Sequence, residues 1–202
     1  IRSMTGQGAT VVMCTHLHSD HITDLNDVVT THWVMTNAPT TLHVYGPPGT
    51  QQVVDGLIAM LEPDISYRLA HHADLDWRPQ VEVHELVPPA TITFGEATVE
   101  VHPTAHRPVE PTVGYRVEHG GRIAALAGDT IPCDGLDALC RGAHLYVQTM
   151  IRADVVRMIP NARLQDILDY HSSVEQSALT AARNGVRTLV GTHFVPPIAP
   201  GA

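Results

Sequence analysis

The sequence predicts an α+β fold in which two mixed β-sheets pack face to face with helices on their outer faces. Short apolar or alternating runs, typical of strands, occur together with segments in which apolar residues recur at helical spacing. These strand and helix segments are mixed in two blocks along the chain. The 202 residues, 44% hydrophobic and 16% charged, suffice for one globular domain with a substantial core, and we expect a single domain over 1–202.

The first part of the chain is expected to alternate between strands and helices. The predicted elements are a buried strand at 9–15, a helix from Asp20 that ends at 37–39, a strand at 41–45, a helix at 53–61 that Pro63 ends, and a loop or lid at 64–80.

The middle of the chain is expected to be β, and the last third alternates again. The predicted strands are 81–87, 92–94 and 97–101 joined by a turn at Gly95-Glu96, 113–117, 122–127, 145–147, and a buried final strand at 186–192. Helical spacing marks 136–139 and 164–168. Ser172 with Glu175 three residues later predicts a capping box for a helix that ends at 184–185.

Composition excludes some classes of function. The net charge of −9, with His counted neutral, argues against a broad basic surface for nucleic acid. No apolar run approaches the ~20 residues of a membrane helix, so we expect no membrane contact. The three cysteines indicate a reducing compartment, and we expect a cytoplasmic location. Cys14, Cys133 and Cys140 lack metal-type spacing and are expected to be buried small hydrophobes. The chain opens on Ile1 and not on Met, so we expect further residues before it.

The stretch His16-Leu17-His18-Ser19-Asp20-His21 carries the strongest functional signal. In an extended segment the side chains repeat every second residue, so His16 and His18 lie on one side. The pattern then becomes helical, and Asp20 and His21 are expected to point elsewhere. Four ligands in two pairs favour two metal ions over one. Imidazole nitrogen and carboxylate oxygen are ligands that Zn²⁺ takes readily.

Further ligands are expected where strands end, because open α/β sheets place their sites beyond the carboxyl ends of strands. His106, Asp129 and His193 each follow a predicted strand. The alternatives are a turn residue for Asp129 and solvated surface histidines for the other two. His102 competes with His106 but lies inside its strand.

At this point the chain resembles the metallo-β-lactamase fold hydrolases. The resemblance rests on the His-x-His-x-Asp-His motif, the lone His106, Gly128-Asp129 after a strand and the late Thr192-His193. It implies an αββα sandwich whose N-terminal strands are absent from this chain, and two divalent metal ions, with zinc expected first and manganese or iron as alternatives. His16, His18 and His106 would hold one ion, Asp20, His21 and His193 the other, and Asp129 would bridge them.

Within that superfamily the chain resembles the ribonuclease Z and arylsulfatase-like branch. His171-Ser172 ahead of the last ligand matches a segment that supplies a non-ligand catalytic histidine; Asp20 and His171 would be the catalytic residues. Two departures stand out. The connection at 118–121 is too short to be the arm that grips transfer RNA in short bacterial ribonucleases Z. Their His-Glu-Ala-Thr motif is replaced by 147–150, with Gln148 at the carboxylate position.

The function predicted from these residues is metal-dependent hydrolysis of a phosphodiester or sulfate ester by a metal-bridging hydroxide, with His171 helping the leaving oxygen. The substrate would be an anionic ester, either a small molecule or an RNA 3′ end. Three alternatives stay open: an arylsulfatase-like enzyme, a lactone or β-lactam hydrolase of the same fold, and a metal-binding module that has lost catalysis. The resemblance also implies a homodimer.

Overall fold

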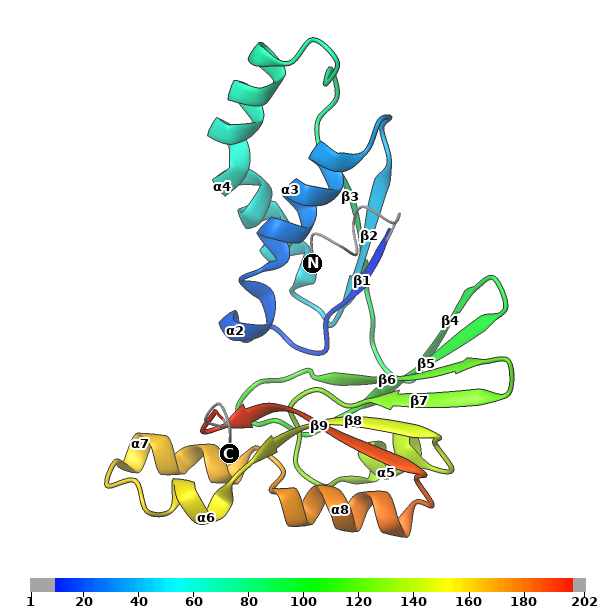
Figure 1. The fold of residues 1–202 in the computed structure, drawn as a ribbon, viewed down its shortest axis with the longest axis vertical. Helices are drawn as coiled ribbons and strands as arrows, with labels where there is room; N and C mark the ends of the chain where they lie inside the picture. Colours follow the sequence, from blue (N-terminus) through cyan, green and yellow to red (C-terminus); the bar gives the residue numbers. More distant parts are fainter. Residues whose placement is uncertain (1–9, 198–202) are drawn as a thin grey trace. The chain divides into compact units, whose positions relative to one another are not determined.

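The computed structural model of this protein describes residues 10–197, which form two compact units. Unit 1 extends to Leu86 and unit 2 begins at Val87. Each unit has its own β-sheet and its own helices, so the predicted mixed architecture with two sheets is present (Figure 1). The predictions for Ala9 and for the loop at 198–202 lie outside the described residues.

Unit 1 contains a parallel sheet with helical crossovers. Its elements in chain order are β1 (Val11–Met13), α2 (Ser19–Ile22), α3 (Leu25–Met35), β2 (Thr41–Gly46), α4 (Thr50–His71) and β3 (Gln80–Glu85). The sheet order is β1-β2-β3, and both pairs are parallel. Parallel neighbours need a crossover on the face of the sheet, which here is helical. Helices α3 and α4 lie on the same side of the sheet (Figure 1).

The core of unit 1 lies between this sheet and the two helices. Leu42 and Val44 of β2 are buried and pack with Val29 of α3 and Val54 of α4. The residues between them in β2 point to the opposite face because strand side chains alternate. Strand β1 is only half-buried, not buried as predicted, and it delivers His16 three residues after its end.

Two helix predictions for unit 1 were wrong in their bounds. The helix expected from Asp20 is divided into α2 and α3, with a break before Leu25. Helix α4 does not end at Pro63 but runs through it to His71, so 64–71 is helix and not loop. Proline removes one backbone donor and disfavours a helix interior. Burial of Ile65 against Trp33, in a second apolar cluster of unit 1, favours continuation of the helix.

Unit 2 contains a six-stranded mixed sheet. Its elements are β4 (Ala90–Phe94), β5 (Ala97–Pro103), β6 (Val113–His119), β7 (Arg122–Leu126), α5 (Asp134–Cys140), β8 (Leu145–Ile151), α6 (Ala153–Val156), α7 (Ala162–Gln165), the 3₁₀ helix η1 (Asp166–Asp169), α8 (Val174–Arg183) and β9 (Thr188–Val195). Strands β4 to β7 pair antiparallel in sequence order, and β7, β8 and β9 pair parallel.

The predicted hairpins of unit 2 are confirmed. Phe94 pairs with Ala97 across a turn in which Gly95 has φ +58°, a conformation that glycine adopts without steric cost. The turn between β6 and β7 is only Gly120-Gly121, because His119 already pairs with Arg122. This connection therefore contains no arm.

Helices α5 and α8 cover the sheet of unit 2 and form its core. Leu136 and Leu139 of α5 are fully buried with Tyr146 of β8 and Ala181 of α8. Burial raises the pKa of the Cys140 thiol in this core to about 12. Cys140 and Cys14 are buried, as predicted, and the three cysteines, all within the described residues, form no disulfide.

Four local predictions for unit 2 need correction. Ser173, not Ser172, caps α8, and Gln176 completes the capping box. The final strand is β9, which begins and ends later than expected and is largely half-exposed. The helix expected at 164–168 is α7 followed by η1. Cys133 is half-buried and accepts the Leu136 amide as the N-cap of α5.

Candidate metal centre

The four candidate ligands of unit 1 come from the loop after β1 and from the first turn of α2. His18 is the extended N-cap of that helix, and Asp20 and His21 lie within it. His16 is fully buried, and its Nδ1 lies 3.1 Å from Thr15 Oγ1. A short strand, an extended tripeptide and a helical turn thus suffice to place all four side chains.

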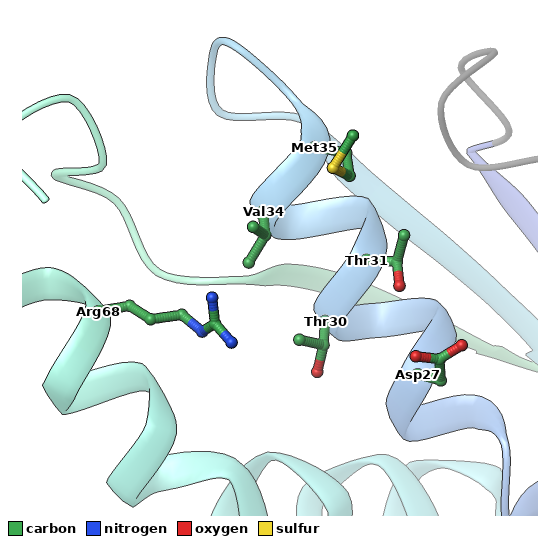
Figure 2. A pocket seen from close by; sticks show the side chains of 6 residues that line it. All are labelled: Asp27, Thr30, Thr31, Val34, Met35 and Arg68. Carbon is green, nitrogen blue, oxygen red and sulfur yellow. The ribbon is translucent and has the colours of Figure 1, made fainter. Parts of the chain in front are cut away.

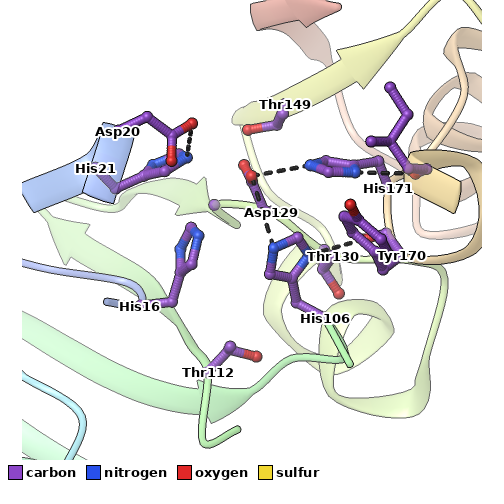
Figure 3. A network of polar contacts seen from close by, with 12 residues as sticks. His16, Asp20, His21, His106, Thr112, Asp129, Thr130, Thr149, Tyr170 and His171 are labelled. Atoms are coloured by element: carbon purple, nitrogen blue, oxygen red, sulfur yellow. Dashed lines mark hydrogen bonds and ion pairs between the residues drawn. The ribbon is translucent and has the colours of Figure 1, made fainter. Parts of the chain in front are cut away.

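The imidazoles of this motif form one group. The His16 ring centroid lies 5.1 Å from that of His18 and 4.2 Å from that of His21. His21 Nε2 lies 3.5 Å from Asp20 Oδ2, and Figure 3 shows these two side chains together at α2. The expectation that Asp20 and His21 point away from the first two histidines is therefore wrong for His21, whose ring is the nearer to His16.

In unit 2 the candidate ligand Asp129 follows β7 in a glycine turn. Gly128 has φ +67°, which allows the chain to turn sharply before the carboxylate. The loop after β5 is tied to the same segment: the Ala105 amide donates to Thr130 Oγ1 at 2.9 Å, and the Ile131 amide donates to the Ala105 carbonyl. These contacts hold His106 beside Asp129, as expected for residues beyond strand ends.

Asp129 lies between two buried histidines (Figure 3). Its Oδ2 is 3.1 Å from His171 Nε2 and 3.9 Å from His106 Nε2, and the two rings are 4.9 Å apart. His106 and Asp129 are at most 2% exposed. Two ligand atoms 3.9 Å apart can share one ion, because metal–ligand bonds of about 2.0–2.2 Å allow such a separation.

Backbone carbonyls fix the tautomer of both histidines. His106 Nδ1 donates to the Tyr170 carbonyl at 2.8 Å, and His171 Nδ1 donates to the Ile167 carbonyl at 3.0 Å. A carbonyl can only accept, so Nδ1 carries the proton and Nε2 is the nitrogen turned toward Asp129. Metal-binding histidines in proteins are oriented in this way by a partner on the second nitrogen.

A second layer of hydrogen bonds holds the Asp129 loop. Ser172 Oγ donates to the Thr130 carbonyl at 2.7 Å, which explains why this buried serine does not cap α8. Gln148 is fully buried, and its Nε2 donates to the carbonyls of Gly128 and Thr149, while its Oε1 accepts from Tyr146 OH. Gln148 therefore supports the loop before Asp129, and Ile167, not Gln148, holds His171.

The Tyr170 side chain packs beside both histidines and is a functional neighbour that sequence reasoning missed. Its ring centroid lies 5.2 Å from that of His106 and 4.7 Å from that of His171. Burial, together with the charges of Asp166 and Asp169, raises the pKa of its phenol, which stays neutral at neutral pH. The one feature of the sequence that could have pointed to Tyr170 is that it directly precedes His171.

His193 lies inside β9 and not beyond its end. Its φ of +46° makes it the one non-glycine residue with positive φ among residues 10–197. This conformation is uncommon outside glycine, and such strain, of order 1–3 kcal/mol, clusters at functional sites.

The weaker candidates are placed elsewhere. His102 lies in β5 and contacts Glu100 at the surface, so His106 is the buried residue of the two. A cavity of about 280 Å³ between α3 and α4 of unit 1 contains none of the predicted site residues (Figure 2). It is lined by Asp27, Thr30, Thr31, Val34, Met35 and Arg68.

The donor set fits divalent metal ions. Each unit brings together imidazole nitrogens and a carboxylate, a combination suited to zinc, manganese and iron, and cysteine is absent from the candidate ligands.

Among residues 10–197, no helix is long and apolar enough to span a membrane.

Comparison with known proteins gives consistent results. A family model described as a β-lactamase superfamily domain matches residues 3–194. The chain is 52% identical over 196 residues to the ribonuclease Z of Mycobacterium bovis, covering 96% of this chain and 70% of that protein. It is 52% identical over 192 residues to a putative ribonuclease Z of Mycobacterium tuberculosis, covering 94% and 86%. The crystal structure of the short form of human tRNase Z has a TM-score of 0.66 at 23% identity, covering 92% of this chain and 72% of that one, which shows a shared fold.

Proposed function

This chain belongs to the ribonuclease Z family of the metallo-β-lactamase superfamily, and from that premise we propose that it cleaves phosphodiester bonds at RNA 3′ ends. The family consists of metal-dependent hydrolases, and its fold implies binding of divalent metal. The two relatives compared above are named ribonuclease Z and putative ribonuclease Z, which favours a phosphodiester over a sulfate ester or a lactone.

We assign the metal ligands to both units. His16, His18 and His106 would hold one ion, Asp20, His21 and His193 the second, with Asp129 between them. This requires the two units to act as a single domain. Support comes from the donor types, the burial of His16, His106 and Asp129, and the carbonyl that fixes the His106 tautomer. Zinc is the expected ion.

The catalytic roles follow from the contacts inside unit 2. Bound divalent ions would activate a water molecule and stabilise charge on the ester oxygens. His171 is not assigned as a ligand, and its Nδ1 proton is held by the Ile167 carbonyl. In the doubly protonated ring, the proton on Nε2 would be the one that passes to the leaving oxygen, which returns the ring to its neutral Nδ1–H form. Asp129 Oδ2, 3.1 Å from that nitrogen, keeps the ring in place. This pair of contacts is the observation that carries the proposal.

The substrate class is narrowed by the short β6–β7 turn. Only Gly120 and Gly121 join the two strands, so a gripping arm for transfer RNA cannot come from this connection. We therefore propose an RNA 3′ end, or a smaller phosphodiester, bound without such an arm. Location in the cytoplasm is proposed because the three cysteines form no disulfide, and a homodimer is proposed from the family resemblance.

A substrate panel tests the proposal. The protein, loaded with Zn²⁺ or Mn²⁺, is assayed with bis-p-nitrophenyl phosphate, p-nitrophenyl sulfate, a β-lactam and an RNA with a 3′ extension. We expect turnover of the two phosphodiesters. Hydrolysis of the sulfate or the β-lactam alone would replace the proposal by the corresponding alternative. Stoichiometric metal without turnover of any substrate would identify a metal-binding module that has lost catalysis.

Assignment of ligands to both units is tested by metal content. His16→Ala in unit 1 and His106→Ala in unit 2 should each lower the bound metal measured by inductively coupled plasma mass spectrometry. His102→Ala, a strand histidine outside the assigned set, serves as the control. Normal metal content in His106→Ala would show that His106 of unit 2 is not a metal ligand.

A further inference from the structure

Three side chains outside the assigned metal centre meet on one face of the unit 1 sheet. His43 belongs to β2, and Glu82 and His84 belong to β3. The parallel register places His43 opposite Glu82, and Tyr45 opposite His84. Because strand side chains alternate, these residues share the face opposite the buried Leu42 and Val44.

The ligand atoms of this group, the β2–β3 cluster, are spaced for coordination of one ion. His43 Nδ1 lies 3.1 Å from His84 Nε2 and 3.6 Å from Glu82 Oε2, and His84 Nε2 lies 3.6 Å from Glu82 Oε1. Zn²⁺ bonds to nitrogen and oxygen are about 2.0–2.2 Å, so tetrahedral ligands lie about 3.3–3.5 Å apart. The nitrogen–nitrogen separation lies just below that range and the two nitrogen–oxygen separations just above it, the latter to different oxygens of Glu82. One ligand atom from each of the three residues lies within 4.8 Å of the other two.

The cluster is accessible and partly pre-organised. The side chains of His43, Glu82 and His84 are 35%, 58% and 29% exposed. The His84 ring stacks on Tyr45, with centroids 4.3 Å apart and planes at 14°. This stacking limits the rotation of His84, so less conformational entropy is lost when a ligand binds.

Outside the ligands assigned above, the other strand histidines among residues 10–197 lack this combination. His102 and Glu100 form a comparable pair two residues apart on β5, but with a single imidazole. Among residues 10–197, and outside the ligands assigned above, the β2–β3 cluster is the one group in which two imidazoles and a carboxylate offer atoms within 4.8 Å of one another.

We propose that His43, Glu82 and His84 form an additional metal site that takes one late first-row divalent ion, Zn²⁺ foremost. Two imidazoles and one carboxylate supply three ligands, and water completes the tetrahedron. Because the ligands come from both strands, the ion links β3 to β2 and stabilises unit 1. The site is independent of the proposed catalytic centre and of its substrate.

The test is a Zn²⁺ titration of the chelator-treated protein with a competing metal indicator. The wild type should bind one Zn²⁺ more than His43→Ala or His84→Ala. Each of these variants lacks one ligand, which should lower the Zn²⁺ affinity of this site by more than about 10-fold, because loss of a residue that only hydrogen-bonds to a ligand already lowers metal affinity by about that factor. Glu82→Gln should weaken the same site while keeping the shape of the side chain. His102→Ala is the matched control, since it removes a strand histidine beside a glutamate and should bind as the wild type does.

Two further measurements separate this site from the catalytic centre. His16→Ala should retain the Zn²⁺ equivalent that His84→Ala loses. Zn²⁺ should raise the thermal midpoint of His16→Ala, and this rise should be smaller in the double variant His16→Ala, His84→Ala, which keeps the other assigned ligands but lacks the β2–β3 site. Equal Zn²⁺ content of the wild type, His43→Ala and His84→Ala, all with unchanged circular dichroism, would overturn the proposal. Loss of the same equivalent in His102→Ala would also overturn it, by showing non-specific surface binding.

Discussion

The two units present their candidate ligands in different ways. In unit 1 the ligands come from six consecutive residues, His16 to His21, across one strand end and one helical turn. In unit 2 they come from three separate segments, at His106, Asp129 and His193, and additional hydrogen bonds hold the first two segments. A contiguous motif needs only its local backbone. A dispersed set needs correct strand register and a surrounding layer, so substitutions outside the ligands should affect unit 2 more than unit 1.

The largest effect is expected at His171. His171→Ala should lower kcat for bis-p-nitrophenyl phosphate by about 10²–10⁴-fold, since it removes the proposed proton donor. Metal content should stay at the wild-type level, in contrast to His21→Ala, which removes a proposed ligand of the contiguous motif. Measurement of kcat and of bound metal on both variants gives the comparison. Unchanged kcat in His171→Ala would contradict the catalytic role.

The next effect concerns Gln148. In Gln148→Glu a carboxylate would face the Gly128 and Thr149 carbonyls, which can only accept hydrogen bonds. Leaving these buried groups without a donor should cost about 1–3 kcal/mol of unfolding free energy, measured by urea denaturation. Gln165→Glu is the matched control, because its amide also donates to two carbonyls but is half-exposed. Equal losses in the two variants would show that burial of Gln148 is unimportant.

A smaller effect is expected at the start of α8. Ser173→Ala should cost about 1 kcal/mol, because Ser173 Oγ accepts the Gln176 amide at the N-terminus of this helix. Turnover should not change, since Ser173 does not contact the Asp129 loop. Ser172→Ala should instead lower turnover, by up to about 100-fold, because its hydroxyl holds the Thr130 carbonyl. A loss of stability in Ser172→Ala and a loss of turnover in Ser173→Ala would instead show that Ser172 caps α8.

The smallest effect is expected at Asp137, which joins α5 to α8. Partial burial pulls its pKa upward, but hydrogen bonds from Arg183 and Asn184 outweigh this and hold the pKa below its ordinary value of 3.8. Asp137→Asn should therefore cost up to about 1 kcal/mol at neutral pH, since the pair is partly exposed.

The pH dependence gives the sign of that contribution. A carboxyl with a lowered pKa stabilises the fold above the unfolded value, and the contribution is lost as the pH falls through the folded pKa. The difference between wild type and Asp137→Asn should thus be constant above about pH 5, decrease as the pH falls through 3.8, and disappear only below the lower pKa of the folded protein. Asp76→Asn, at an exposed carboxyl of unit 1, controls for the change in net charge. A difference that persists in acid would exclude the ion pair as its cause.

Errors in the sequence predictions follow the same contrast. The hairpin at Gly95 was predicted correctly, because glycine with positive φ is a local requirement. Pro63 did not end α4, because burial of Ile65 with Trp33 favours the longer helix, and that contact joins distant residues. The capping box shifted by one residue for a similar reason: Ser172 is drawn to the Thr130 carbonyl, 42 residues away.

The sequence by itself determined the family, the contiguous motif from His16 to His21 and the candidate ligands at 106, 129 and 193, because residue type and spacing carry that information. The tertiary structure alone decided which nitrogen of each histidine faces Asp129. The carbonyl that accepts from His106 Nδ1 belongs to Tyr170, 64 residues away. It also decided that His43 meets His84, 41 residues apart, since strand register and not local sequence brings them together. Contacts of this range depend on how strands pair, and no short stretch of sequence specifies that pairing.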